Sequence, residues 1–184
     1  MSFSIDTFTS KLAQGGALAS LFEAEITTTK GVEEASAVAD FRFLCKAASL
    51  PGDAIDVATV TYMGRQINIP SNRAATTWET TVYNDEGMEI RNNIESWMEQ
   101  LNSHKSNKRA AAMTQIQSYT GTLKIKTFGK ASGTVITKSY EFIDAWPSAV
   151  GEIAVDWETN DIQTYPVTWE FSYWRSSKSN VGFE

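Results

Sequence analysis

Apolar and polar residues alternate with a period of two along several short stretches of the chain. In an extended strand successive side chains point to opposite faces, so each such stretch predicts a strand with one buried face. The first four are LFEAEITTT (21–29), VADFRFLCK (38–46), VATVTYMGRQINIP (57–70) and WETTVY (78–83). Residues 30–37 predict a hairpin loop between the first two strands, and Met63-Gly64 predicts a turn inside the third stretch.

The apolar period changes after residue 84. Spacings of three and four residues place one stripe of side chains on a single helical face: Ile90, Ile94, Trp97, Met98 and Leu101. This stripe predicts one helix over about 85–102, packed on a core rather than lining a cofactor site. Asn84 or Asp85 is the predicted N-cap, because short polar side chains accept hydrogen bonds from the first backbone amides.

A second strand-rich region follows a polar linker, residues 102–115. Two predicted strands, 119–128 and 134–142, flank the glycine-containing turn GKASG, and 151–159 and 162–174 predict two more. The last stretch places aromatic and aliphatic side chains on one face, predicted to be core: Tyr165, Val167, Trp169, Phe171 and Tyr173. Pro166 indicates an edge strand or a strand start, because proline donates no ladder hydrogen bond.

These patterns predict a mainly β protein, an antiparallel β-sandwich or barrel with one flanking helix. Residues 1–20 predict an N-terminal arm, 21–174 a single β domain, and 175–184 a C-terminal tail without periodicity. No apolar run reaches the roughly 20 residues of a membrane-spanning helix. The first residues also lack the basic and apolar regions of a secretion signal.

Residues able to carry chemistry are few. Cys45 shares the predicted core face of Phe41 and Phe43, so we expect it to be buried and inert. The only histidine, His104, lies in a polar run, and no nucleotide-binding or zinc-binding motif is present. We therefore predict no catalytic residue, no metal and no cofactor. A monomeric β-sandwich hydrolase or binding module remains the alternative from another functional class.

Charge is distributed in three blocks. The whole chain has net charge −6, with −7 in residues 1–104, +7 in residues 105–138 and −6 in residues 139–184. A net acidic chain is a poor candidate for tight binding of nucleic acid, because such binding needs clustered Lys and Arg side chains. The basic block is consistent with contacts between oppositely charged regions of neighbouring copies, and equally with a solvated hairpin.

Five strings, taken together and in order, resemble one protein family. They are FLCKAASLPG (43–52), YMGRQINIP (62–70), NRAATTWETTVYNDEGMEIRNNIESW (72–97), WPSAVGEIAVDW (146–157) and NDIQTYPVTWEFSYW (160–174). The chain thereby closely resembles the tail tube proteins of T-even-like, contractile-tailed bacteriophages over about residues 20–174. It departs from the family type in loop 27–38 and beyond Trp174.

The resemblance implies a structural virion protein that is not an enzyme. Such subunits form hexameric rings that stack into a hollow tube inside a contractile sheath, conduct the genome and are driven through the host envelope. The implied partners are further copies of the chain, the sheath protein, the baseplate tube initiator, the tape measure and the tail terminator. Genomic DNA would pass without specific binding, and assembly would take place in the host cytoplasm. The inner tube of a phage-derived injection particle or pyocin is the alternative.

Three sets of residues are candidates for assembly or conduction. Segment 46–57 resembles the ring-stacking segment of the family, with candidates Lys46, Leu50, Pro51, Ala54 and Ile55. The lysine-rich hairpin 119–142, which we call the basic hairpin, is expected to contact an acidic neighbouring subunit through Lys124, Lys126, Lys130 and Lys138. Carboxylates that repel DNA are candidates for the lumen, or are ordinary outer-surface groups: Glu152, Asp156, Glu158 and Glu170.

Overall fold

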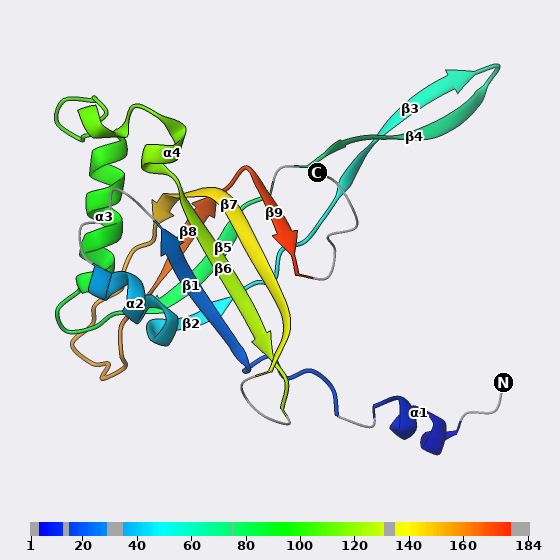
Figure 1. Cartoon of the computed structure of the whole chain (residues 1–184), viewed down its shortest axis with the longest axis horizontal. Helices are drawn as coiled ribbons and strands as arrows, with labels where there is room; N and C mark the ends of the chain where they lie inside the picture. The colour runs from blue at the N-terminus through cyan, green and yellow to red at the C-terminus, as the bar shows by residue number, and fades with distance from the viewer. Residues whose placement is uncertain (1–3, 13–14, 29–34, 75, 131–134, 178–184) are drawn as a thin grey trace.

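The computed structural model describes residues 4–12, 15–28, 35–74, 76–130 and 135–177 (Figure 1). Its strands are β1 (Phe22–Thr28), β2 (Cys45–Ala48), β3 (Ile55–Tyr62), β4 (Arg65–Arg73), β5 (Trp78–Tyr83), β6 (Gly121–Phe128), β7 (Ile136–Val150), β8 (Thr164–Glu170) and β9 (Tyr173–Ser176). Its helices are α1 (Ile5–Lys11), α2 (Ala35–Leu44), α3 (Glu89–Leu101), the short 3₁₀ helix η1 (Ala111–Met113) and α4 (Ile116–Tyr119).

The main sheet is antiparallel throughout and bends along one long strand. Its order is β1-β6-β7-β8-β5-β2, with β9 beside β7, while β3 and β4 form a separate two-stranded hairpin. The first part of β7 pairs with β6 and β9, and its last residues pair with β8. Shortly before the change of partner lies Asp144, whose φ of 55° is left-handed and breaks the regular pleat. The predicted mainly β, antiparallel fold with a flanking helix is confirmed.

The core lies between the two halves of this bent sheet. Trp78 of β5 stacks on Phe142 of β7, with ring centroids 4.5 Å apart. Trp169 of β8 is fully buried and meets Phe41 of α2 and Trp97 of α3, at centroid distances of 6.2 and 6.0 Å. Its indole Nε1–H donates to the Thr80 hydroxyl over 3.0 Å, so burial leaves the polar atom satisfied.

Helix α3 is the predicted helix, but it begins four residues later. Ile90, Ile94 and Trp97 are buried as the stripe predicted. The N-cap position belongs to Met88 in a left-handed conformation, and neither Asn84 nor Asp85 occupies it. The Asp85 carboxylate still accepts a hydrogen bond from the Glu89 amide over 3.2 Å, which satisfies one free donor of the first turn.

The strand predicted over 38–46 is wrong. Most of segment 38–46 is helix α2, with Phe41 buried and Phe43 68% exposed. Phe41, Leu44 and Cys45 have the i, i+3, i+4 spacing of a helix, and an alanine-rich start favours that conformation. Residues 30–34 of the predicted hairpin loop lie outside the described residues, but a hairpin between 21–29 and 38–46 is excluded because β1 pairs with β6 and 35–44 is helical. Cys45 is buried as predicted, and burial raises the pKa of its thiol to about 12.

The last part of the chain also differs from the prediction. Segment 151–159 contains no strand, and the predicted strand over 162–174 divides into β8 and β9. The core face holds for Tyr165, Val167 and Trp169, after which the chain turns and leaves Tyr173 more than half exposed. Trp174 packs on Tyr140, with ring centroids 5.6 Å apart, so β9 completes the sheet with residues of the predicted tail.

Pro166 does not lie on an edge strand, since β8 runs between β7 and β5. It is the third residue of β8, beyond the point where β7 ends at Val150. Its missing N–H therefore costs no bond to β7, while its carbonyl accepts from the Gly151 amide over 2.7 Å. The predicted arm contains α1, which buries no residue and lies apart from the body (Figure 1).

Candidate functional site

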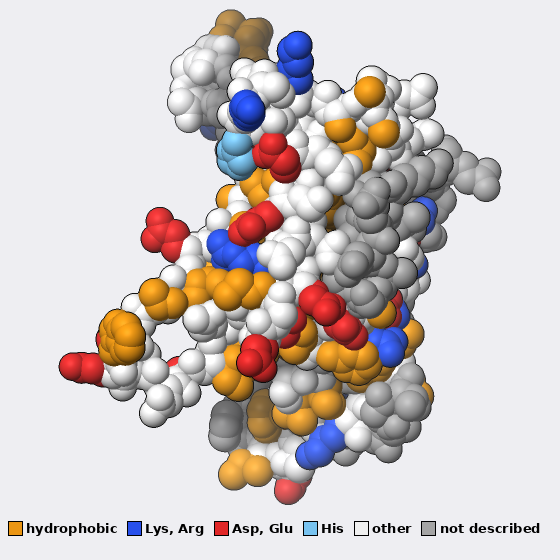
Figure 2. Space-filling view, turned by 90° about the vertical axis from the view of Figure 1, so that its left-hand side faces the viewer, with side chains coloured by type: hydrophobic (Ala, Val, Ile, Leu, Met, Phe, Trp, Pro, Cys, Tyr) orange, Lys and Arg blue, Asp and Glu red, His pale blue; other side chains and the backbone are white. Residues whose placement is uncertain are grey.

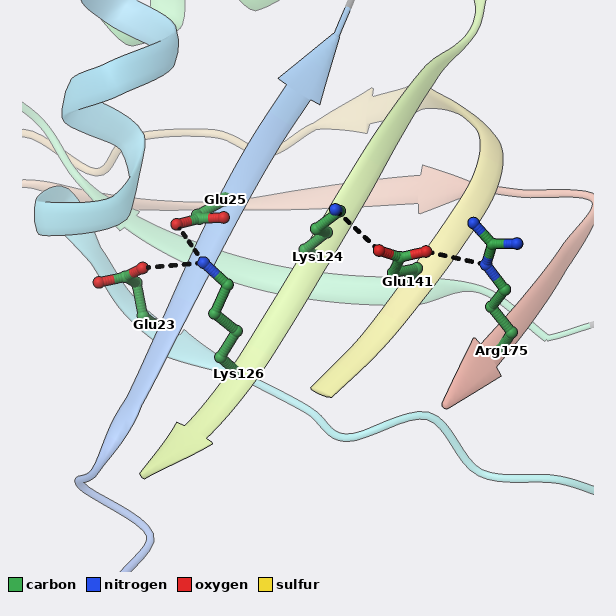
Figure 3. A network of polar contacts seen from close by, with 6 residues as sticks. All are labelled: Glu23, Glu25, Lys124, Lys126, Glu141 and Arg175. Carbon is green, nitrogen blue, oxygen red and sulfur yellow. Dashed lines mark hydrogen bonds and ion pairs between the residues drawn. The ribbon is translucent and has the colours of Figure 1, made fainter. Parts of the chain in front are cut away.

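A row of alternating charges crosses the outer face of the four-stranded sheet β1-β6-β7-β9. The strand registers place Glu25 opposite Lys124, Lys124 opposite Glu141, and Glu141 opposite Arg175. Each of these residues comes from a different strand (Figure 3). Strand parity explains the row, because residues between these positions, such as Leu123, face the core. We call the row and its neighbours Glu23 and Lys126 the charge ladder.

Every cation of the charge ladder has a carboxylate partner within its own chain. Lys124 Nζ lies 2.7 Å from Glu141 Oε1, and Arg175 Nε donates to Glu141 Oε2 over 2.8 Å. Lys126 Nζ lies 2.6 Å from Glu25 and 3.5 Å from Glu23. Three carboxylates thus face three cations, and the ladder is neutral at pH 7 (Figure 3).

The pKa shifts within the ladder follow from these pairs. Hydrogen bonding from Lys124, helped by Arg175, holds the pKa of Glu141 below its ordinary value. Burial acts to raise the pKa of Glu25, but hydrogen bonds with Glu23 and Lys126 outweigh it, so that pKa is also lowered. The Glu25 carboxylate, followed by burial, raises the pKa of Glu23. Glu25 is therefore the principal partner of Lys126, whereas the ionised form of Glu23 is disfavoured.

The sheet that carries the charge ladder ends in two edge strands, β1 and β9, and helix α2 packs closely against β1. Within the described residues, β1 pairs only with β6 and β9 pairs only with β7. Helices α2 and α3 contribute Phe41 and Trp97 to the core side, so neither lies over the ladder. An exposed edge strand is a ready template for another chain. The surface therefore combines an uncovered charged face with two edges able to pair with further copies.

The β3–β4 hairpin is the second exposed feature. It projects from the body as a two-stranded ribbon (Figure 1), and every residue in both strands is solvent-exposed. Met63 and Gly64 form its predicted turn, both with positive φ as a type I′ turn requires. Arg73 pairs with Asp53 at its base.

Comparison with known proteins identifies the family. The family model described as phage tail tube protein matches residues 10–177. The chain belongs to the phage tail tube protein family. It is 32% identical over 136 residues to the tail tube protein gp19 of Enterobacteria phage T4, covering 73% of this chain and 81% of that protein. The corresponding protein of Enterobacteria phage T6 matches with the same identity and coverage. This tail tube protein is therefore a structural component of a contractile phage tail, and not an enzyme.

Solved structures share the fold of this tail tube protein. A chain of the sheath-tube complex of the extracellular contractile injection system PVC has a TM-score of 0.63 at 14% identity, covering 95% of this chain and 98% of that one. A chain of the anti-feeding prophage cap also has a TM-score of 0.63, at 15% identity, with coverage of 88% and 90%. Identities this low support a shared fold and nothing more specific.

The tail tube protein distributes its predicted basic residues among different environments. Lys124 and Lys126 belong to the charge ladder, so their charges are matched inside the subunit. Lys138 Nζ lies 4.8 Å from the ring centroid of Tyr140, and Lys130 is exposed beside the turn. The sequence pattern found the cations but missed the partners of Lys126, because Glu23 and Glu25 are about a hundred positions away.

The predicted lumen carboxylates lie away from the charge ladder. Glu152, Asp156 and Glu158 belong to the exposed segment 151–163, and Glu170 ends β8 opposite Trp146. Four of the predicted stacking residues lead into the β3–β4 hairpin, whereas Lys46 lies at the opposite end of β5. Lys46 is in β2 near the ring of Tyr83, Leu50 and Ala54 are exposed, Pro51 is half-buried, and Ile55 begins β3.

The described part of the chain offers no catalytic or metal-binding arrangement. The imidazole of His104 is almost fully exposed, and its nearest carboxylate, Glu99, lies 3.8 Å away. No group of three potential metal ligands occurs among the described residues. No described helix is long and apolar enough to span a membrane.

Proposed function

We propose that this chain forms hexameric rings that stack into the hollow inner tube of a phage tail and conduct the genome. The observation that carries this is family membership together with the two edge strands of the four-stranded sheet. Pairing of β1 in one copy with β9 in the next would continue the sheet around a ring. Closing a sheet on itself removes its edges, which an isolated subunit leaves exposed.

The outer face of this sheet is the proposed channel wall. Lys and Arg side chains bind DNA because they neutralise its phosphates and release the condensed counterions. Unpaired lysines on the channel wall would therefore bind the genome and slow its passage. The charge ladder offers no free cation, because each of its three is matched by a carboxylate. The proposed wall is therefore neutral and paired, in place of the acidic wall expected from sequence. DNA would pass it without specific binding.

Contacts between stacked rings are assigned to segment 46–57 and to the β3–β4 hairpin that follows it. Leu50 and Ile55 are each about half exposed in the subunit, which is unfavourable unless another surface covers them. We propose that they dock on the next ring. Leu50→Asp would then reduce tube polymerisation, and normal polymerisation of that variant would contradict the assignment. The basic hairpin contributes to subunit contacts mainly through Lys130 and Lys138, and raising salt should weaken that part of assembly.

Similar chains occur in structures of a sheath-tube complex, a tube terminator and a baseplate. On this basis we propose that the tube also contacts a sheath protein, a baseplate initiator, a tape measure and a terminator. A conducting phage tube is preferred to a genome-free particle because the curated relatives are tail tube proteins of phages.

Disulfide cross-linking tests the ring. Thr27→Cys near the end of β1 and Tyr173→Cys at the start of β9 place thiols on the two edge strands, and both positions are exposed. Buried Cys45 does not interfere. Mild oxidation of assembled protein should give a ladder of covalent oligomers ending at six subunits. Each single-cysteine variant is the control, and should stay monomeric on a non-reducing gel.

The cross-linking result distinguishes head-to-tail from two-fold pairing. Cross-linked oligomers of up to six subunits in the double variant, and in neither single variant, support a ring closed by pairing of β1 with β9. Dimers in a single-cysteine variant would indicate that like edges meet, which cannot generate a ring of this kind. Absence of cross-links from protein that assembles normally would exclude these edges from the ring contact.

A further inference from the structure

The β3–β4 hairpin has one apolar face that nothing in the described subunit covers. Cross-strand register places Val60 opposite Ile67 and Ala58 opposite Ile69, and Tyr62 opposite Arg65 beside the turn. The other face carries mainly hydroxyl and amide side chains: Thr59, Thr61, Gln66 and Asn68. A lone two-stranded ribbon is marginally stable in water. Its amphipathic pattern therefore indicates a face that is covered in an assembly.

Segment 151–163, which we call the acidic loop, is a second uncovered apolar surface. Val155 and Ile162 are 78% and 70% exposed, and Trp157 is fully exposed. The loop has four carboxylates and no Lys or Arg. Figure 2, which views the left-hand side of Figure 1, shows hydrophobic and acidic side chains together on a segment that projects from the body. A tryptophan surrounded by polar groups is a common anchor in protein interfaces.

The hairpin and the acidic loop lie at opposite ends of the same strand. β5 begins at Trp78, shortly after the hairpin returns at Arg73, and ends at Tyr83. There the Asn84 amide donates to the Gln163 carbonyl over 2.9 Å, which fixes the end of the acidic loop. The six residues of β5 span about 20 Å. Different patches on opposite ends cannot meet within one molecule, but they can meet head to tail between copies.

We propose that the apolar face of the hairpin docks on the acidic loop of a second copy in the adjacent ring. This inference rests on the proposed tube function and names the surface that receives the stacking hairpin. The charges are complementary, since Arg65 at the hairpin turn has no ion-pair partner among the described residues and Glu158 is likewise free. Asp156 instead accepts from the Glu158 amide over 3.0 Å and shapes the loop. Glu158 and Trp157 would thus face the next ring instead of the lumen.

A charge exchange tests this contact. Arg65→Glu and Glu158→Arg should each convert stacked tubes into separate rings, measured by sedimentation and electron microscopy of the purified chain. Combining the two substitutions should restore tubes at least partly, because the opposite charges then face each other again. Asp6→Arg, at an exposed carboxylate on α1 away from both surfaces, is the matched control and should stack normally.

Three outcomes decide the inference. Rings from each single variant and tubes from the double variant support it. Normal tubes from both single variants overturn it and leave the tube function intact. Rings from the single variants without recovery of tubes in the double variant also overturn the proposed pairing, because Arg65 and Glu158 then do not contact each other. Failure of the wild-type chain to form rings or tubes would instead count against the proposed function.

Discussion

Replacing Trp169 by alanine should strongly destabilise the subunit. The indole is fully buried, contacts the rings of Phe41 and Trp97, and donates a hydrogen bond to Thr80. Removing a large buried aromatic side chain costs about 3–5 kcal/mol of unfolding free energy, from lost burial and the cavity left behind. That is a large fraction of the roughly 5–15 kcal/mol that keeps a typical domain folded.

Urea unfolding followed by circular dichroism measures the effect. With a typical m-value of about 2 kcal/mol per molar urea, the midpoint should fall by about 2 M. The chain should be studied under conditions where the midpoint is independent of concentration, because assembly adds apparent stability. Trp157→Ala is the matched control, and its fully exposed side chain predicts a change within about 0.5 kcal/mol. A loss below about 1 kcal/mol for Trp169→Ala would refute the assigned core face of β8.

Three further predictions concern the charge ladder and the β7–β8 junction. Glu25→Gln should destabilise the subunit by about 1 kcal/mol at pH 7, whereas Glu23→Gln should be neutral or slightly stabilising. Because folding lowers the pKa of Glu25, the stability that its carboxylate contributes should be lost as the pH falls below its ordinary pKa of 4.5, which urea midpoints would show. Gly151→Ala places a methyl group 2.4 Å from the facing proline ring and should cost about 1–3 kcal/mol in the same assay, so an unchanged midpoint would contradict this packing. Glu141→Gln leaves Lys124 and Arg175 of the proposed channel wall without their carboxylate, so assembled tubes should retain DNA in low salt, unlike tubes of the Glu86→Gln control.

The sequence pattern predicted the buried face correctly in β5 and in β8 as far as Trp169, whereas β3 and β4 are exposed on both faces. In β5 the buried residues are Trp78, Thr80 and Val82, as the alternation required. Segment 38–46 is ambiguous, because apolar residues there fit spacings of two and also of three and four. The helix forms because it brings Phe41 onto Trp169, a contact between distant segments that local periodicity cannot report.

The charge ladder was less accessible to sequence reasoning than the core. Predicting it requires the register between β1 and β6 and the bend of β7 at Asp144. Similarly, the alternation in β8 continues past Glu170, but the chain turns there and the Ser172 amide donates to the Ile143 carbonyl. Such a turn depends on the neighbouring strand. The resemblance predicted the family, while the face that carries the charge ladder and the faces of the β3–β4 hairpin depend on three-dimensional register.

Electron microscopy of the purified chain is the most direct test of tube formation. We expect hollow tubes, or stackable rings with six-fold symmetry, formed by this protein alone. In a reconstruction, the face bearing Lys124 and Glu141 should line the channel. Monodisperse monomers at concentrations and salt conditions that support tube assembly by its phage relatives would contradict the proposed tube.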